Sequence, residues 1–506
     1  MIKTFRHTRL KVQLLFLLLL DVGITACKKD SNNINKPDIV FYALGSNNQL
    51  MQYNANNTQM PMGATLNITG LQTSETILAI DFRPATGQLY GLGSSSRIYA
   101  INLNTGAATA IGSGAFTPAI SGNILGFDFN PTVDRIRLVT STGQNLRLHP
   151  ETGAVAAVDG NINGINGVAI SSSAYTNNKA GASSTTLFNI DVVAQKLYKQ
   201  DPPNDGKLVE IGSLGISAST GNSGFDISAD GIALATIANG SNTTLYQIDV
   251  NTGAATNLGN LASNAIGIAI PTEPVAYAVD DTNNLLIFNP KNPSVITKAI
   301  TGLGNGENIV GIDFRPVNGQ LYALSSGSRL YTINLASGAA TAIGLPPLLG
   351  YLSGTSFGFD FNPTVDRIRV VSNTGQNLRL NPNDGALAAT DGMLNPGTPT
   401  VTAAAYTNNF AGATTTVLFD IDVNSDRLFT QIPPNDGTLV GVGTGLGVNV
   451  DAANGFDIGG TTGIAYAILT SSNVSKIYQI NLTTGIATAV ADFPKQVRGF
   501  ALGLGF

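Results

Sequence analysis

Six aspartates that recur in two halves of the chain are the residues best suited to chemistry. The second half repeats the first at an offset of 231–232 residues, so a residue that serves both halves should occur twice. Several carboxylates held together would offer the oxygen ligands that Ca²⁺ prefers. The alternative is structural, with each carboxylate accepting hydrogen bonds from a neighbouring turn or pairing with an arginine. The six are Asp81, Asp128 and Asp226 with their counterparts Asp313, Asp360 and Asp457.

Two turn motifs are the candidate ligand-binding loops. The sequence Tyr-Thr-Asn-Asn begins at Tyr175 and again at Tyr406, and Pro-Pro-Asn-Asp-Gly begins at Pro202 and again at Pro433. Their composition is that of tight turns, and exposed turns are where rigid scaffolds carry binding residues. We expect the ligand contacts to come from Tyr175, Asn177 and Asn178 and from Tyr406, Asn408 and Asn409.

Side chains for nucleophilic or histidine-based catalysis are missing. His149 is replaced by Asn381 in the second half, and His7 lies in the N-terminal leader. Paired carboxylates for polysaccharide cleavage remain an alternative, because Asp is plentiful and Glu75 recurs as Glu307; such a pair must lie about 5–10 Å apart. We therefore name no catalytic residue and keep a surface hydrolase or lyase as the competing hypothesis.

Short alternating runs separated by turns must position these residues. The stretch 126–148 returns at 358–380 with 20 of 23 positions identical, and each copy of it alternates apolar and polar residues between Pro and Thr-Gly turns. Four such runs per roughly 45 residues are typical of a β-propeller blade. The sequence predicts an all-β fold without a long helix after residue 27 and with about five blades in each half.

The two halves allow two arrangements. Copy 1, residues 39–271, and copy 2, residues 272–506, meet within the four-residue junction Pro-Thr-Glu-Pro at 271–274. Each copy can close as a five-bladed ring, copy 1 through the strand at 266–270. Alternatively, the C-terminal segment 498–506 completes the first blade and closes one ten-bladed ring. We favour two tandem five-bladed rings, because each copy is complete in itself.

The N-terminus carries an export and anchoring signal. Residues 1–11 are basic, 14–20 are apolar, and small residues precede Cys27, the only cysteine. The pattern resembles a bacterial lipoprotein signal peptide, which is removed from the mature chain. The resemblance implies a signal peptide over 1–26, lipidation of Cys27, and an anchor and tether over 27–38 that hold the protein in the cell envelope, at the outer membrane. An ordinary buried cysteine is the alternative interpretation.

Several motifs together resemble a bacterial family known only as a domain of unknown function, DUF4394. They are DFRP, GFDFNPTVDRIR, TGQNLRL, AYTNN and PPNDG, and they cover nearly all of both copies. The resemblance implies a propeller-like β fold in exported proteins and brings no activity or catalytic residue.

Composition narrows the class of partner. Charged residues make up 12% of the chain, and no Lys/Arg cluster follows Lys29, which argues against nucleic acid. The sequence therefore predicts a lipid-anchored β-propeller that acts as a binding scaffold for a protein or glycan and needs no cofactor unless Ca²⁺ is bound. A structural envelope protein is the third hypothesis.

Overall fold

The computed structural model describes residues 35–217, 219, 221–345, 350–452 and 454–506. Cys27, the predicted signal peptide and most of the tether lie outside the described residues. In the described part, no helix is long and apolar enough to cross a membrane. The two short 3₁₀ helices, η1 (Pro203–Asp205) and η2 (Pro434–Asp436), are formed by the Pro-Pro-Asn-Asp-Gly motif in each copy.

The described residues form ten four-stranded antiparallel sheets, five in each copy. This confirms the all-β prediction. The sheets of copy 1 consist of β20 (Gly267–Ala269), β1 (Val40–Gly45), β2 (Gln49–Asn54) and β3 (Leu66–Asn67); β4 (Ile77–Phe82), β5 (Leu89–Gly93), β6 (Arg97–Ile101) and β7 (Ala108–Ile111); β8 (Leu125–Asn130), β9 (Arg135–Thr140), β10 (Asn145–Leu148) and β11 (Val155–Val158); β12 (Ser172–Tyr175), β13 (Leu187–Asp191), β14 (Lys196–Gln200) and β15 (Leu208–Ser213); and β16 (Ser223–Ile227), β17 (Ala233–Asn239), β18 (Asn242–Ile248) and β19 (Ala255–Asn260).

Copy 2 repeats this plan with one strand taken from the end of the chain. Its sheets consist of β40 (Val497–Leu502), β21 (Ala276–Asp280), β22 (Asn284–Asn289) and β23 (Asn292–Ala299); β24 (Ile309–Arg315), β25 (Gln320–Ser325), β26 (Leu330–Ile333) and β27 (Ala340–Ala342); β28 (Phe357–Asn362), β29 (Arg367–Ser372), β30 (Asn377–Leu380) and β31 (Leu387–Thr390); β32 (Val401–Tyr406), β33 (Leu418–Asp422), β34 (Arg427–Gln431) and β35 (Leu439–Val442); and β36 (Gly455–Ile458), β37 (Ala465–Ser471), β38 (Val474–Ile480) and β39 (Ala487–Phe493).

One edge strand of each sheet contacts the corresponding edge strands of its neighbours, and we call these the inner strands. In copy 1 they contact one another in the order β20, β4, β8, β12, β16 and again β20. In copy 2 the order is β40, β24, β28, β32, β36 and again β40. The inner strands therefore bring residues from five sheets of one copy to a shared centre.

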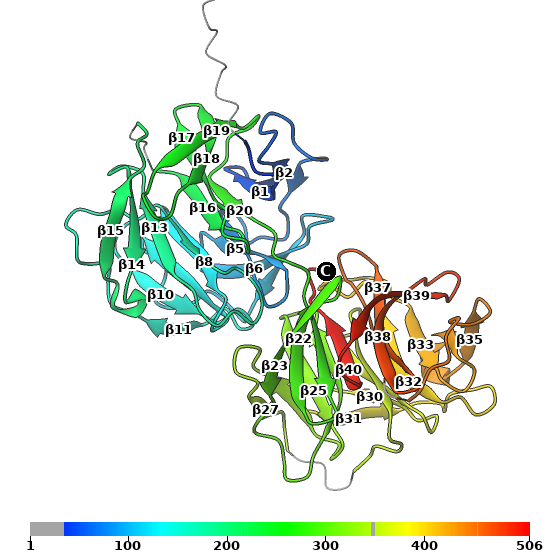
Figure 1. Ribbon diagram of the computed structural model, residues 1–506. Coiled ribbons are helices and arrows are strands. Elements are labelled where there is room, and N and C mark those ends of the chain that lie inside the picture. Colours follow the sequence, from blue (N-terminus) through cyan, green and yellow to red (C-terminus); the bar gives the residue numbers. More distant parts are fainter. Residues whose placement is uncertain (1–34, 218, 220, 346–349, 453) are drawn as a thin grey trace, which may run out of the picture. The chain divides into compact units, whose positions relative to one another are not determined.

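The last strand of each copy pairs with the first strand of the same copy. β20 is antiparallel to β1, with Ile268 opposite Ala43. β40 is antiparallel to β21, with Phe500 opposite Ala278. Figure 1 shows β40, in red, among the green strands of its sheet. The tail of the chain thus completes the first sheet of copy 2, whereas the ten-bladed arrangement required it to pair with β1.

The hydrophobic core lies between neighbouring sheets, because alternate residues of each strand face the next sheet. Tyr90 of β5 meets Phe129 of β8 edge-on, with ring centroids 5.1 Å apart. Burying one such ring contributes roughly 1.5–3 kcal/mol. At Gly224 on β16 there is room only for glycine, because a Cβ there would lie 2.4 Å from the amide nitrogen of Ile268 in the adjacent inner strand.

Candidate functional site

The six recurring aspartates gather into two buried groups. Asp81, Asp128 and Asp226 stand on β4, β8 and β16, and in each group one carboxylate oxygen per residue lies within 4.8 Å of the others. Their counterparts Asp313, Asp360 and Asp457 stand on β24, β28 and β36. All six residues are at most 1% exposed. We call the two groups the copy 1 triad and the copy 2 triad.

Most of the triad oxygens accept hydrogen bonds from backbone amides and join one sheet to the next. In Asp81, Oδ1 accepts from its neighbour Phe82 at 2.7 Å, and Oδ2 accepts from Phe129 on the next inner strand at 2.7 Å. Asp226 likewise accepts from Ile227 at 2.6 Å and from Ile270 at 2.5 Å. The carboxylates thus have the structural role that the sequence left open, as links between sheets.

Asp128 differs from the other members of the copy 1 triad. Its Oδ1 accepts from the amide of Tyr175 at 3.0 Å, but its buried Oδ2 has no hydrogen-bond partner in the described structure. Burial, followed by the charges of Asp81 and Asp226, raises the pKa of Asp128 well above its usual range. Burial raises the pKa of Asp226 to about 6. These three groups destabilise one another's charged forms.

The copy 2 triad makes the matching backbone hydrogen bonds. Asp313 accepts from Phe314 at 2.7 Å and from Phe361 at 2.8 Å, and Asp360 accepts from Tyr406 at 3.0 Å. Burial raises the pKa of Asp457 to about 7. Among the described residues, no Lys or Arg forms an ion pair with any carboxylate of either triad.

Arg137 and its counterpart Arg369 belong to buried structural networks. Arg137 Nη1 donates to Asp159 at 2.6 Å and to Asn145 at 2.8 Å, and Nη2 donates to Asn204 of the Pro-Pro-Asn-Asp-Gly turn at 2.7 Å. Arg369 bonds to Asp391 and Asn435 in the same way. Asp159 and Asp391 therefore neutralise these arginines. Because they recur at the 232-residue offset, the internal repeat was the signal that could have identified them.

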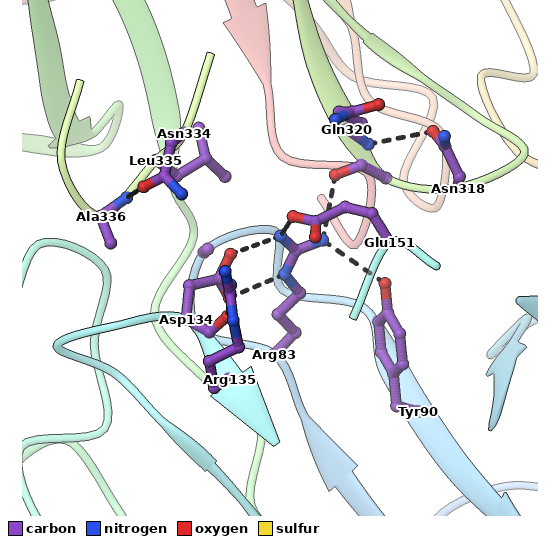
Figure 2. A network of polar contacts seen from close by, with 12 residues as sticks. Arg83, Tyr90, Asp134, Arg135, Glu151, Asn318, Gln320, Asn334, Leu335 and Ala336 are labelled. Atoms are coloured by element: carbon purple, nitrogen blue, oxygen red, sulfur yellow. Dashed lines mark hydrogen bonds and ion pairs between the residues drawn. The ribbon is translucent and has the colours of Figure 1, made fainter. Parts of the chain in front are cut away.

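Arg83 is the most deeply buried arginine among the described residues and belongs to a second charged network. Figure 2 shows its guanidinium between Asp134, Glu151 and Tyr90. The side chain is 0% exposed, and Nε donates to Asp134 Oδ1 at 2.9 Å while Nη2 also bonds Glu151. The counterpart Arg315 is 11% exposed and meets Asn383 where copy 1 has Glu151. In this network copy 1 thus has one more charged side chain than copy 2.

The predicted ligand-binding turns are only partly accessible. Tyr175 and Tyr406 are 1% exposed, and Tyr175 Oη accepts a hydrogen bond from Arg137 at 3.2 Å. Asn178 and Asn409 are also 1% exposed. Asn177 is exposed, and its side-chain amide donates to the backbone oxygen of Ser184 at 2.9 Å. Asn408 makes the matching bond to Thr415 and is half-buried. Only these two side chains of the set reach solvent.

A cavity of about 220 Å³ opens where the inner strands of copy 2 begin. Segments at or beside the starts of all five inner strands contribute to its wall, so its shape depends on five sheets at once. Neutral polar and apolar side chains both contribute to the wall, together with the carboxylate of Asp281 and the guanidinium of Arg498. The lining residues are Asp281, Val310, Thr355, Ser356, Phe357, Thr402, Ala452, Asn454, Gln496, Val497 and Arg498.

The fold defines an all-β protein built from ten four-stranded antiparallel sheets in two copies. A family model for a domain of unknown function, DUF4394, matches residues 49–269 and 284–501. The chain therefore belongs to this family and carries two tandem copies of the domain, as its motifs predicted. None of the curated proteins matches the chain.

Among the many solved structures that resemble the chain are two bacterial proteins, both at low identity. The extracellular domain of BT4673 from B. thetaiotaomicron has 10% identity and a TM-score of 0.26, over 90% of this chain and 64% of that chain. PorZ, a surface component of the type-IX secretion system of Porphyromonas gingivalis, has 14% identity and a TM-score of 0.26, over 91% of this chain and 59% of that chain. The chain spans less than two thirds of the length of either protein.

Proposed function

We propose that the protein is an exported, lipid-anchored β-propeller with two five-bladed rings, which binds a glycan at the mouth of the second ring. The cyclic order of contacts among the inner strands of each copy supports two rings. The strand pairs β1–β20 and β21–β40 support closure of each ring by its own last strand, which leaves no open edge there.

The cavity in copy 2 is the observation that carries the binding proposal. Concave sites lined by an apolar surface and a few convergent polar groups are the usual places for small-ligand binding. Side chains such as Ser356, Thr402 and Gln496 can donate or accept, which matches the hydroxyl groups of a sugar. A cavity of about 220 Å³ suits one sugar unit of a glycan better than the flat surface of a protein.

The enzyme hypothesis receives no support from the described cavities. A glycoside hydrolase needs two carboxyl groups on either side of the scissile bond. None of five cavities among the described residues is lined by a pair of carboxylates, and Asp281 supplies the single carboxylate of the cavity at the inner strands of copy 2. The triads are buried beneath backbone bonds. A purely structural role would not require the cavity.

Blocking the cavity should abolish glycan binding. The experiment compares the mature wild-type chain, Thr355→Trp and Asn123→Trp on an array of bacterial and host glycans. Thr355 is an exposed residue of the cavity wall, whereas Asn123 is its exposed counterpart in copy 1. We expect the wild type and Asn123→Trp to bind the same glycans and Thr355→Trp to bind them at least tenfold more weakly. A wild type that binds no glycan, or a Thr355→Trp variant that binds normally, contradicts the proposal.

The lipid anchor is tested separately, in bacterial cells that express the full-length chain. Acyl chains on Cys27 would insert into the bilayer at about 0.8 kcal/mol per buried CH₂, and several chains would hold the protein firmly. Cell fractionation of Cys27→Ser should therefore move the protein from the membrane to the soluble fraction. An unchanged distribution contradicts the lipid anchor and leaves the binding proposal intact.

A further inference from the structure

The copy 1 triad concentrates acidic groups that form no ion pair with any of the described residues. Its three carboxylates converge within 4.8 Å, and each residue is 1% exposed. Burying an unpaired carboxylate costs several kcal/mol, so such groups take up a proton or bind a cation. The backbone bonds of Asp81 and Asp226 occupy both oxygens of each residue but leave further lone pairs, because a carboxylate can accept about four hydrogen bonds.

Asp128 supplies a separate reason to expect a ligand. Its Oδ2 is buried, accepts nothing within the described structure, and belongs to a side chain that the amide of Tyr175 holds in place through Oδ1. Buried polar atoms in native proteins nearly always have a partner, which can be an ion or a water. An orphaned carboxylate oxygen beside two further carboxylates is a donor set made only of oxygen, which suits a hard cation.

We propose that the copy 1 triad binds one calcium ion through Asp81, Asp128 and Asp226, with the free Oδ2 of Asp128 as a direct ligand. The upper limit of 4.8 Å between ligand atoms equals twice a typical Ca–O distance of about 2.4 Å, so the three residues can reach a common ion. The ion would neutralise the triad and fasten three of the five inner strands of copy 1 to one another.

The role of such an ion would be to stabilise the ring rather than to perform chemistry. Asp81 links β4 to β8, Asp128 links β8 to β12, and Asp226 joins β16 to the end of β20. An ion bound by the three carboxylates would hold β4, β8 and β16 directly. Through the hydrogen bonds of the same carboxylates it would also stabilise β12 and β20. Because it binds only the folded chain, it should raise the melting temperature, and the rise should grow with the logarithm of the Ca²⁺ concentration once that exceeds the dissociation constant.

The experiment uses the full mature chain, freed of metal with EGTA and held at pH 8, where competition from protons is weakest. Equilibrium dialysis against Ca²⁺ counts bound ions, and thermal melting is followed with and without Ca²⁺. Asp128→Asn keeps the shape of the side chain and an acceptor for Tyr175 but removes the charge. Asp205→Asn is the control, because it removes one exposed carboxylate from the same copy.

We expect Asp128→Asn to bind one ion fewer per chain than the wild type, and Asp205→Asn to bind the same number. The rise in melting temperature caused by Ca²⁺ should be smaller in Asp128→Asn than in the wild type, and it should be unchanged in Asp205→Asn. Should Asp128→Asn fail to fold by circular dichroism, Asp81→Asn serves in its place. The proposal is overturned if the wild type binds no Ca²⁺, or if the triad variant binds as many ions as the wild type; the triad would then be neutralised by protons.

Discussion

Replacing Arg83 with alanine should lower the free energy of unfolding by about 3–5 kcal/mol, because it leaves buried carboxylates without their cation. Asp134 and Glu151 both bond the Arg83 guanidinium, and their side chains are 8% and 17% exposed. Two negative charges would remain close together in a poorly solvated site. Urea unfolding followed by circular dichroism measures the loss.

The second copy supplies the matched control for this prediction. Arg315→Ala removes the counterpart arginine, but only one carboxylate, Asp366, loses its partner, and that side chain is 29% exposed. We expect a loss of roughly 1–2 kcal/mol. Adding Glu151→Asn, the residue of copy 2, to Arg83→Ala should recover part of the stability. If Arg83→Ala and Arg315→Ala lost equal amounts of unfolding free energy, the extra carboxylate of Glu151 in copy 1 would not have the effect that we assign to it.

The second large effect concerns Asp420 and depends on pH. Asp420 is 0% exposed, and neither of its oxygens has a hydrogen-bond partner in the described structure. Burial, opposed by the charge of Arg369, raises the pKa of Asp420 to about 8. Its counterpart Asn189 donates to Gln200 Oε1 at 2.9 Å. In copy 2 the matching oxygen, Gln431 Oε1, is buried and has no hydrogen-bond partner among the described residues, so a protonated Asp420 would restore the missing bond.

The sign of the pH dependence follows from this raised pKa. The unfolded carboxyl loses its proton near pH 3.9, whereas the folded one keeps it to about pH 8. The stabilising contribution is therefore complete below about pH 4, declines by at most about 1.4 kcal/mol per pH unit as pH rises, and is lost above the folded pKa. Asp420→Asn supplies a permanent donor and should gain stability relative to the wild type between pH 5 and pH 8.

Chemical denaturation at pH 5, 6, 7 and 8 measures the difference in stability between Asp420→Asn and the wild type. Asn189→Asp is the reciprocal variant, which should introduce a new decline in stability with pH. A difference between Asp420→Asn and the wild type that stays constant across this range would show that Asp420 is ionised throughout, contrary to this account.

The sheets were predictable because their signals are local. Alternating runs and Gly, Pro and Thr-Gly turns mark the strands, and the 231–232-residue offset separates residues shared by both copies from incidental ones. Asp81, Asp128 and Asp226 occupy the same place in successive units, so a fold that places those units round a centre brings them together. The structure brings the three carboxylates within 4.8 Å.

Contacts between sheets were harder to foresee. Tyr175 is typical of an exposed turn in sequence, yet its hydroxyl group is buried against Arg137. Asp134 meets Arg83, which lies 51 residues away in the preceding sheet. The binding cavity was not predicted at all, because its wall combines one to three residues from each of five strand ends. These contacts and the cavity depend on how neighbouring sheets pack against one another. A short sequence pattern does not predict that packing.

Two closed five-bladed rings are the central claim, and a cysteine-pairing experiment tests it most directly. In a Cys27→Ser background, Ala43→Cys is combined with either Ile268→Cys or Phe500→Cys. Ile268 lies opposite Ala43 in the β1–β20 pair, whereas Phe500 lies opposite Ala278. Mass spectrometry after mild oxidation should find a disulfide in the 43–268 protein and none in the 43–500 protein. A disulfide in the 43–500 protein alone would mean that the chain's tail pairs with β1 and that all ten sheets form one ring.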